Sequence, residues 1–177
     1  MKKALILHCW FGSPIGDWYP WLTTELTKRG YEVWVPELPT FETNAPDLET
    51  AIKFVMDKNF VDSETIVIGH SLGTLLAMRL AERIQYAQAI LLAAWDYNDL
   101  TPEHASFWHN MIDHDLCKKN VAKWSVLISD NDPYVTKILA GEVAGRFGAE
   151  KIMVGPKGHF LAKDDGVTEV PEILTLV

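Results

Sequence analysis

The sequence has 177 residues, the length of one ordinary domain, and its 48% hydrophobic and 23% charged residues are typical of a globular protein rather than a disordered or fibrous one. A formal net charge of −8 argues against a nucleic-acid partner, because proteins that bind nucleic acids carry basic patches. No run of 18 apolar residues predicts a membrane span, so we expect a single domain over residues 1–177 with no membrane partner.

The chain begins with two lysines and the apolar run Ala4–Leu7. This run is too short for a signal peptide and predicts a first β-strand. The two cysteines, Cys9 and Cys117, are too few for the disulfide framework of a small secreted protein. We therefore expect a cytoplasmic protein.

Short apolar runs rich in Val, Ile and Leu alternate along the chain with segments of helical spacing. The apolar runs lack strict alternation, which is typical of strands buried on both faces. They are Ala4–Leu7, Glu32–Val35, Thr65–Gly69, Ala89–Ala94, Ser125–Ser129 and Lys151–Val154. Apolar stripes with helical spacing cover residues 18–26, 48–56, 72–80, 135–147 and 170–177.

This alternation predicts an α/β fold, a three-layer α/β/α sandwich with a mainly parallel six-stranded sheet. Ligands bind such sheets at the carboxyl ends of the strands, so the residues that follow each strand are the candidates for a site. Only about 30 residues separate the fourth strand from the fifth, which leaves no room for a large cap domain.

The third apolar run leads into Gly69-His70-Ser71-Leu72-Gly73 and then into a helical stripe. A G-x-S-x-G sequence between a strand and a helix is the context of a nucleophile elbow, a strained turn that exposes the serine hydroxyl above the sheet. A plain glycine-rich turn is the alternative interpretation. We predict that Ser71 is a nucleophile.

A serine nucleophile needs a base, which in this type of site follows the acid in the chain. His159 lies just after the last apolar run, where the base is expected. His8 precedes the elbow and is expected to order its loop, whereas His70 lies inside the elbow and is expected to point away from the serine. Three further histidines, His104, His109 and His114, are spaced by five residues, which does not favour a helical metal site.

Two carboxylates after the fifth strand qualify as the acid that orients the base, namely Asp130 and Asp132. We prefer Asp132, because it lies deeper in the loop and directly before Pro133, while Asp130 can brace the turn. Asp96, after the fourth strand, is a third candidate. The 27 residues from Asp132 to His159 fit one helix, one strand and a turn, which returns the chain to the same sheet edge.

An oxyanion hole completes such a site. We expect one donor to be the amide of Leu72, the residue after the nucleophile, and the other to be the amide of Trp10 in the loop after the first strand. Neither G-x-G-x-x-G nor a P-loop lysine motif is present, so we expect neither a nucleotide nor any other cofactor, and no metal.

With these motifs the chain resembles the small α/β-hydrolases grouped with retinoblastoma-binding protein 9 and a relative from bacilli. The resemblance covers nearly the whole length and includes the elbow, the acid loop 129–135, Gly158-His159-Phe160 and the aromatic segment Asp17-Trp18-Tyr19-Pro20-Trp21-Leu22. It implies an α/β-hydrolase fold without a large cap, serine hydrolase activity of the esterase or aminopeptidase kind, and a triad of Ser71, Asp132 and His159.

Two departures from the family pattern stand out. Many hydrolases have His-Gly at the start of the oxyanion loop, where this chain has His8-Cys9. The Leu-x-Cys-x-Glu motif for binding retinoblastoma-type pocket proteins is absent, so no such partner is inferred.

Aromatic residues near the strand ends predict the kind of substrate. We expect an aromatic wall above Ser71, with a hydrophobic patch packed on the sheet as the equal alternative; its residues are Trp10, Phe11, Trp95, Tyr97, Phe107 and Trp108. We expect Phe11, Trp95 and Phe160 to contact a small or aromatic acyl group of an ester or amide. A catalytically silent binding protein and an acyltransferase with the same triad are the alternative functions.

Overall fold

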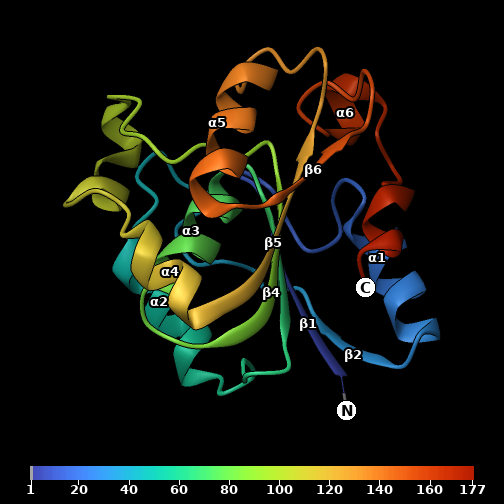
Figure 1. The fold of residues 1–177 in the computed structure, drawn as a ribbon, viewed down its shortest axis with the longest axis horizontal. Coiled ribbons are helices and arrows are strands. Elements are labelled where there is room, and N and C mark those ends of the chain that lie inside the picture. The colour runs from blue at the N-terminus through green and yellow to red at the C-terminus, as the bar shows by residue number, and fades with distance from the viewer. Residues whose placement is uncertain (1) are drawn as a thin grey trace.

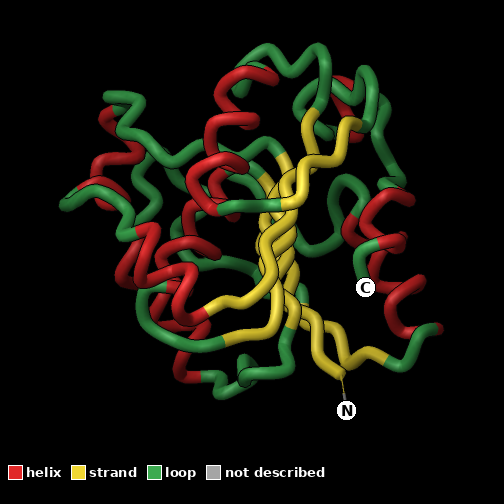
Figure 2. The backbone as a smooth tube through the Cα atoms, viewed as in Figure 1, coloured by secondary structure: helices red, strands yellow, loops and turns green. Residues whose placement is uncertain are grey.

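The computed structural model describes residues 2–177 and contains one six-stranded, all-parallel sheet with the strand order β2-β1-β3-β4-β5-β6. The sheet crosses the middle of the molecule with helices on both sides (Figure 2). The strands are β1 (Lys2–Leu7), β2 (Tyr31–Trp34), β3 (Ile66–His70), β4 (Tyr86–Leu92), β5 (Val121–Ile128) and β6 (Glu150–Met153). The predicted three-layer architecture is confirmed, because each apolar run forms a strand.

The helices divide between the two faces of the sheet (Figure 1). They are α1 (Tyr19–Lys28), α2 (Leu48–Asp57), α3 (Leu72–Ala81), α4 (His114–Asn120), α5 (Lys137–Phe147) and α6 (Ala162–Asp165), with 3₁₀ helices at Pro102–Trp108 and Pro171–Thr175. The apolar stripe at 170–177 forms only the second 3₁₀ helix. No helix within residues 2–177 has both the length and the apolar character needed to cross a bilayer.

Two hydrophobic cores lie on opposite faces of the sheet, and successive strand residues contribute to them in turn. In β1, Leu5 and Leu7 belong to the core under α2, α3 and α5, whereas Ala4 and Ile6 belong to the core under α1. This alternation follows from the two-residue period of a strand. It explains the unbroken apolar runs in the sequence, since both faces of each central strand are covered.

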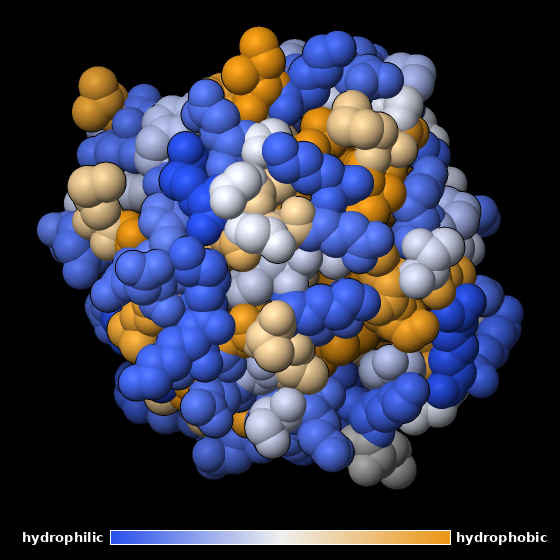
Figure 3. All heavy atoms as spheres, in the orientation of Figure 1, coloured by the Kyte–Doolittle hydropathy of each residue, from blue (hydrophilic) through white to orange (hydrophobic). Residues whose placement is uncertain are grey.

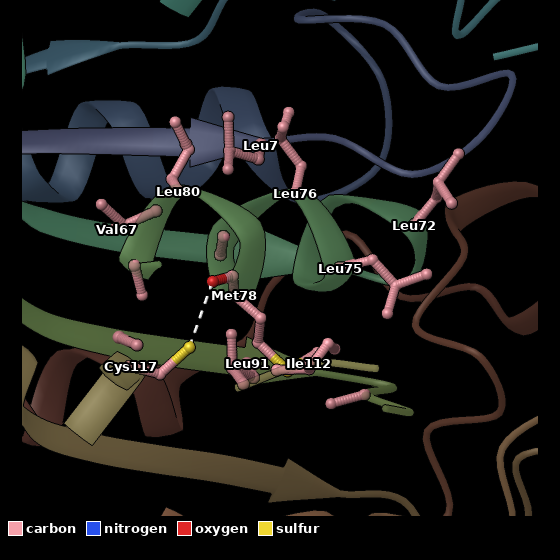
Figure 4. Packing of buried hydrophobic residues seen from close by; sticks show 14 of the residues in the cluster. Leu7, Val67, Leu72, Leu75, Leu76, Met78, Leu80, Leu91, Ile112 and Cys117 are labelled. Atoms are coloured by element: carbon pink, nitrogen blue, oxygen red, sulfur yellow. Dashed lines mark hydrogen bonds between the residues drawn. The ribbon is translucent and has the colours of Figure 1, made fainter. Parts of the chain in front are cut away.

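Helix α3 is buried along its whole length. Figure 4 shows its leucines packed over Leu7 of β1 and Val67 of β3, and the Cys117 thiol of α4 donating to the Met78 carbonyl at 3.3 Å. The helix approaches β1 so closely that a Cβ on Gly73 would lie 2.2 Å from the Leu7 carbonyl oxygen. A glycine at this position therefore allows the turn between β3 and α3 to lie close to the end of β1.

Hydrophilic side chains predominate on the face of the molecule shown in Figure 3, with hydrophobic side chains gathered in separate patches. The segment between β4 and β5 contains only the first 3₁₀ helix and the short α4. This segment does not form a large cap, as predicted.

Candidate active site

Ser71 occupies the turn between β3 and α3 with φ +52° and ψ −119°, a strained conformation for a residue other than glycine. Its amide donates to the Leu92 carbonyl at 2.9 Å, and its carbonyl accepts from the Thr74 amide and hydroxyl at 2.8 and 2.7 Å. A Cβ on Gly69 would lie 2.7 Å from the Gly73 carbonyl oxygen, so both flanking glycines are needed for the turn. The geometry is that of an elbow with the hydroxyl at its tip.

The hydroxyl of Ser71 lies 2.8 Å from His159 Nε2, and His159 Nδ1 lies 2.9 and 3.0 Å from the two carboxylate oxygens of Asp132. All three residues are buried. A carboxylate only accepts hydrogen bonds, so Nδ1 carries the proton and Nε2 is free to accept one from the serine. This arrangement can deprotonate Ser71 and stabilise the resulting imidazolium.

The other two carboxylate candidates have different partners. Asp130 is exposed, and its amide donates to the Gly155 carbonyl at 3.0 Å. Asp96 is buried between Arg146, at 2.6 Å, and His114, at 2.7 Å. Within residues 2–177, Asp132 is the carboxylate of these three that contacts His159.

The carboxylate of Asp132 is fixed by its own loop. Oδ1 of Asp132 accepts from the amides of Tyr134 and Val135, both at 2.9 Å. These bonds form because Asp132 begins a tight turn in which the following amides point back at its side chain. They orient the carboxylate toward His159.

Two polar side chains that are not among the predicted site residues, Asp165 and Asn131, hold the loop that carries His159. Asp165 Oδ2 accepts from the amides of His159 and Leu161 at 2.8 and 3.0 Å, and Asn131 Oδ1 accepts from the Gly158 amide at 2.8 Å. The sequence carries a weak signal for Asn131, which lies between the two aspartates of the acid loop. It carries none for Asp165.

In the loop after β1, the amide of Trp10 has no partner among the described residues although the amides on both sides of it do. The amide of Cys9 donates to the Tyr19 hydroxyl at 3.1 Å, that of Phe11 to the Phe41 carbonyl at 2.9 Å, and that of Gly12 to the Cys9 carbonyl at 3.0 Å. The intervening amide of Trp10 makes no hydrogen bond within residues 2–177, and neither does that of Leu72 at the start of α3. These are the two amides expected to form an oxyanion hole.

His8 and Cys9 shape this loop. His8 donates from Nδ1 to the Cys9 carbonyl at 2.8 Å and accepts at Nε2 from the Leu38 amide at 3.1 Å. Burial lowers the pKa of His8, which keeps the ring neutral for both bonds. Burial also raises the pKa of the Cys9 thiol to about 12, so the thiol is not a competing nucleophile.

A cavity of about 620 Å³ opens beside Ser71 and His159. Four aromatic side chains line it, together with polar residues of the 99–104 segment. The aromatic residues are Trp10, Trp95, Tyr97 and Tyr134. The expected aromatic wall is therefore present in part, and Tyr134, which packs edge-on against the His159 ring at 5.0 Å, is an addition that the sequence analysis misses.

Two of the expected substrate contacts do not line this cavity. Phe160 is fully buried in the core on the α1 face, where it packs against His70, because its φ of +62° turns its side chain away from the cavity. Phe11 is 57% exposed and stacks on Trp10 instead. Of the proposed wall, Phe107 is buried in the other core and Trp108 lines a second cavity.

Four of the other histidines, His8, His70, His104 and His114, have hydrogen-bond partners within the protein, whereas His109 is exposed. His104 pairs with Asp99 at 3.1 Å and His114 with Asp96. In the described part of the chain, the group with metal-ligand spacing is Cys9, Asp17 and His70. Both ring nitrogens of His70 are already hydrogen-bonded, to Tyr19 and to the His159 carbonyl, so this group does not fit a metal ion.

Comparisons with known proteins place the chain in a family. The model of a family described as serine hydrolase matches residues 4–177. The chain is 29% identical over 167 residues to the serine hydrolase RBBP9 of Rattus norvegicus, covering 89% of this chain and 87% of the relative. It is 24% identical over 176 residues to YdeN of Bacillus subtilis (strain 168), covering 96% and 91%. The crystal structure of the B. subtilis ydeN gene product matches with a TM-score of 0.88 at 24% identity over 99% of this chain and 96% of that one.

Proposed function

Since the chain belongs to the serine hydrolase family and has the α/β-hydrolase fold that its motifs predict, we propose that it cleaves small ester or amide substrates through an acyl-enzyme on Ser71. One observation carries the proposal, the continuous hydrogen-bonded relay from Ser71 Oγ through His159 to the Asp132 carboxylate. Ser71 and His159 are 88 positions apart in the sequence, and Asp132 and His159 are 27 positions apart. Packing alone does not require these three polar side chains to meet.

The steps use only side chains and amides of the chain. Ser71 Oγ attacks the substrate carbonyl carbon while His159 Nε2 takes its proton, and Asp132 stabilises the charged ring. His159 then gives the proton to the leaving alcohol or amine as the bond to it breaks. Water, deprotonated by His159, attacks the acyl carbon, the bond from this carbon to Ser71 Oγ breaks, and His159 returns the proton to Oγ as the acid product leaves.

The amides of Trp10 and Leu72 would hold the oxyanion of each tetrahedral intermediate. The support is that both are free donors, while the amides beside Trp10 are occupied. Amides that are fixed and unpartnered before the reaction cost little reorganisation when charge develops.

The aromatic lining of the cavity favours a small or aromatic acyl group. Flat rings of Trp95, Tyr97 and Tyr134 offer stacking surfaces, and a volume of about 620 Å³ suits a compact substrate. We expect aromatic esters to have higher kcat/KM than aliphatic esters of equal size. Equal values across ester length and aromaticity would contradict this substrate class.

Labelling with a fluorophosphonate probe tests the nucleophile and its base. The wild type is expected to be labelled at Ser71, and Ser71→Ala and His159→Ala are expected to lose labelling. His109→Ala is the matched control, because His109 is exposed and lies outside the site, and it is expected to be labelled like the wild type. A folded wild type that remains unlabelled near neutral pH would favour the silent binding protein.

Product analysis separates hydrolysis from acyl transfer. With an ester substrate, hydrolysis is expected to yield the free acid whether or not an alcohol or amine is added. A product that becomes mainly the new ester or amide would assign the triad to an acyltransferase. We also propose that the protein acts in the cytoplasm, since both cysteines are free, buried thiols, one in the loop after β1 and the other in α4.

A further inference from the structure

A chain of buried hydrogen bonds runs from the Cys9 amide through Tyr19 and His70 to the carbonyl of His159. The Cys9 amide lies 3.1 Å from the Tyr19 hydroxyl, which lies 2.6 Å from His70 Nδ1. His70 Nε2 lies 2.7 Å from the carbonyl oxygen of His159. Tyr19 and His70 are fully buried, so these contacts are shielded from water.

The two ends of the chain fix the direction of every bond. An amide only donates and a carbonyl only accepts, so Cys9 donates to the Tyr19 oxygen and His70 donates from Nε2 to His159. Tyr19 must then donate its own proton to His70 Nδ1. Burial raises the pKa of Tyr19 and lowers the pKa of His70 to about 3, so the phenol keeps its proton and the imidazole stays neutral.

These hydrogen bonds join three segments whose relative positions matter for the proposed reaction. Cys9 directly precedes Trp10 in the oxyanion loop, His70 directly precedes Ser71 in the elbow, and His159 is the base. Tyr19 is the first residue of α1, which lies across the sheet from α3 (Figure 1). The bonds span 10, 51 and 89 residues, so no local segment alone could hold this arrangement.

On the basis of the proposed function, we infer that Tyr19 and His70 are positioning residues that hold the oxyanion amide and the base in register around Ser71. Neither touches substrate; each acts through its neighbour in the chain. Phe in place of Tyr, or Leu in place of His, would suit the surrounding apolar core better, because buried polar groups cost free energy unless they are paired. The presence of polar side chains at positions 19 and 70 is therefore explained by the backbone groups that they bind, the Cys9 amide and the His159 carbonyl.

Tyr19→Phe tests the inference, because it removes the hydroxyl and keeps the ring. Its kcat is expected to fall about 10- to 100-fold with KM within about twofold of the wild type, since misplaced catalytic groups lower the rate of the chemical step. Affinity for a trifluoromethyl ketone, which forms a tetrahedral oxyanion on the serine, is expected to fall with kcat. Tyr86→Phe is the matched control, as Tyr86 is also fully buried and its hydroxyl makes one bond, to the Ala77 carbonyl at 3.0 Å.

Tyr86→Phe is expected to lower the melting temperature and to leave kcat and ketone affinity unchanged. Tyr19→Phe with kcat and ketone affinity within twofold of the wild type would overturn the inference while leaving the proposed function intact. A wild type that turns over no ester and takes no fluorophosphonate would overturn both.

A second pair of variants tests the other residue in case Tyr19→Phe does not fold. His70→Gln retains an amide donor for the His159 carbonyl and an acceptor for Tyr19, whereas His70→Leu retains neither. His70→Gln is expected to retain at least tenfold more kcat than His70→Leu at similar KM. Equal kcat in the two variants would show that only the bulk of the side chain matters, and the inference would fail.

Discussion

Gly158 packs directly against the carboxylate of Asp165, so that a Cβ on Gly158 would lie 1.8 Å from Asp165 Oδ1. The other oxygen of this carboxylate accepts from the amides of His159 and Leu161. The missing side chain at position 158 therefore lets Asp165 hold the backbone on both sides of the proposed base.

Gly158→Ala is expected to displace this carboxylate and, with it, the His159 ring. A shift of about 1 Å in a catalytic group can cost about 10²-fold in rate, so we expect a fall of that order in kcat. Gly155→Ala is the matched control, because Gly155 also has a positive φ, +70° against +54°, but nothing lies within 4 Å of its Cβ. Steady-state kinetics checks both variants, and equal losses would attribute the effect to backbone strain instead of contact with Asp165.

Gly73→Ala is expected to force α3 away from β1, because its Cβ would lie 2.2 Å from a backbone oxygen of Leu7 that has little freedom to move. We expect the free energy of unfolding to fall by about 3 kcal/mol, at the upper end of ordinary overpacking. Gly141→Ala, in α5 with open space around its Cβ, is instead expected to gain about 1 kcal/mol of helix propensity. Urea unfolding measures both, and a Gly73→Ala protein as stable as the wild type would contradict the close packing of α3.

The sheet is predictable from the sequence because burial decides it. Alternate residues of β1, such as Leu5 and Ile6, enter different cores, and this two-sided burial is what an unbroken apolar run indicates. Ser71, Asp132 and His159 can be proposed without a structure for a related reason. Each lies in the loop after a strand, after β3, β5 and β6 respectively, and parallel strands end at the same edge of the sheet.

The groups that support the site are not predictable in this way. Periodicity reports which face of an element is buried, but not which polar group its side chain meets across the fold. Tyr19 therefore looks like one more core aromatic in the sequence, although its hydroxyl serves Cys9 and His70. The expectation for Phe160 fails for the opposite reason, since a residue beside the base can turn into the core when its backbone φ is positive.

Asp132→Asn is expected to lower kcat by about 10⁴-fold, because an amide in place of the carboxylate favours the wrong tautomer of the catalytic histidine. Asp130→Asn is the matched control from the same loop. Because Asp130 is exposed, this variant is expected to leave kcat unchanged. Asp96→Asn is expected to lower the melting temperature through loss of the Arg146 and His114 contacts, with kcat retained. Ester kinetics would contradict this assignment if Asp96→Asn or Asp130→Asn lost more activity than Asp132→Asn.

Stability is expected to fall as the pH is lowered from about 6.5, because burial holds the pKa of His70 near 3 in the folded protein. Between these values the unfolded chain binds a proton that the folded protein does not, so the free energy of unfolding decreases by about 1.4 kcal/mol for each unit that the pH falls. His8, whose pKa burial also lowers, adds to the slope in the same direction. In the neutral ring, Nδ1 of His70 accepts a hydrogen bond from the Tyr19 hydroxyl. Protonation would place a hydrogen on Nδ1, so the charged ring could no longer accept this bond.

Urea unfolding at pH 7.5, 6.5, 5.5 and 4.5 measures this dependence. The carboxylates of Asp47, Glu49 and Asp62, whose pKa values are lowered by their hydrogen-bond partners, begin to add to the slope only toward pH 4.5, and they do so equally in the wild type and in the variants. His70→Gln, which cannot bind a proton in either state, is expected to show a slope smaller by about 1.4 kcal/mol per pH unit. His109→Gln, at an exposed position, is expected to keep the wild-type slope. An unchanged slope in His70→Gln would mean that the folded protein accepts a proton on His70 as readily as the unfolded chain does.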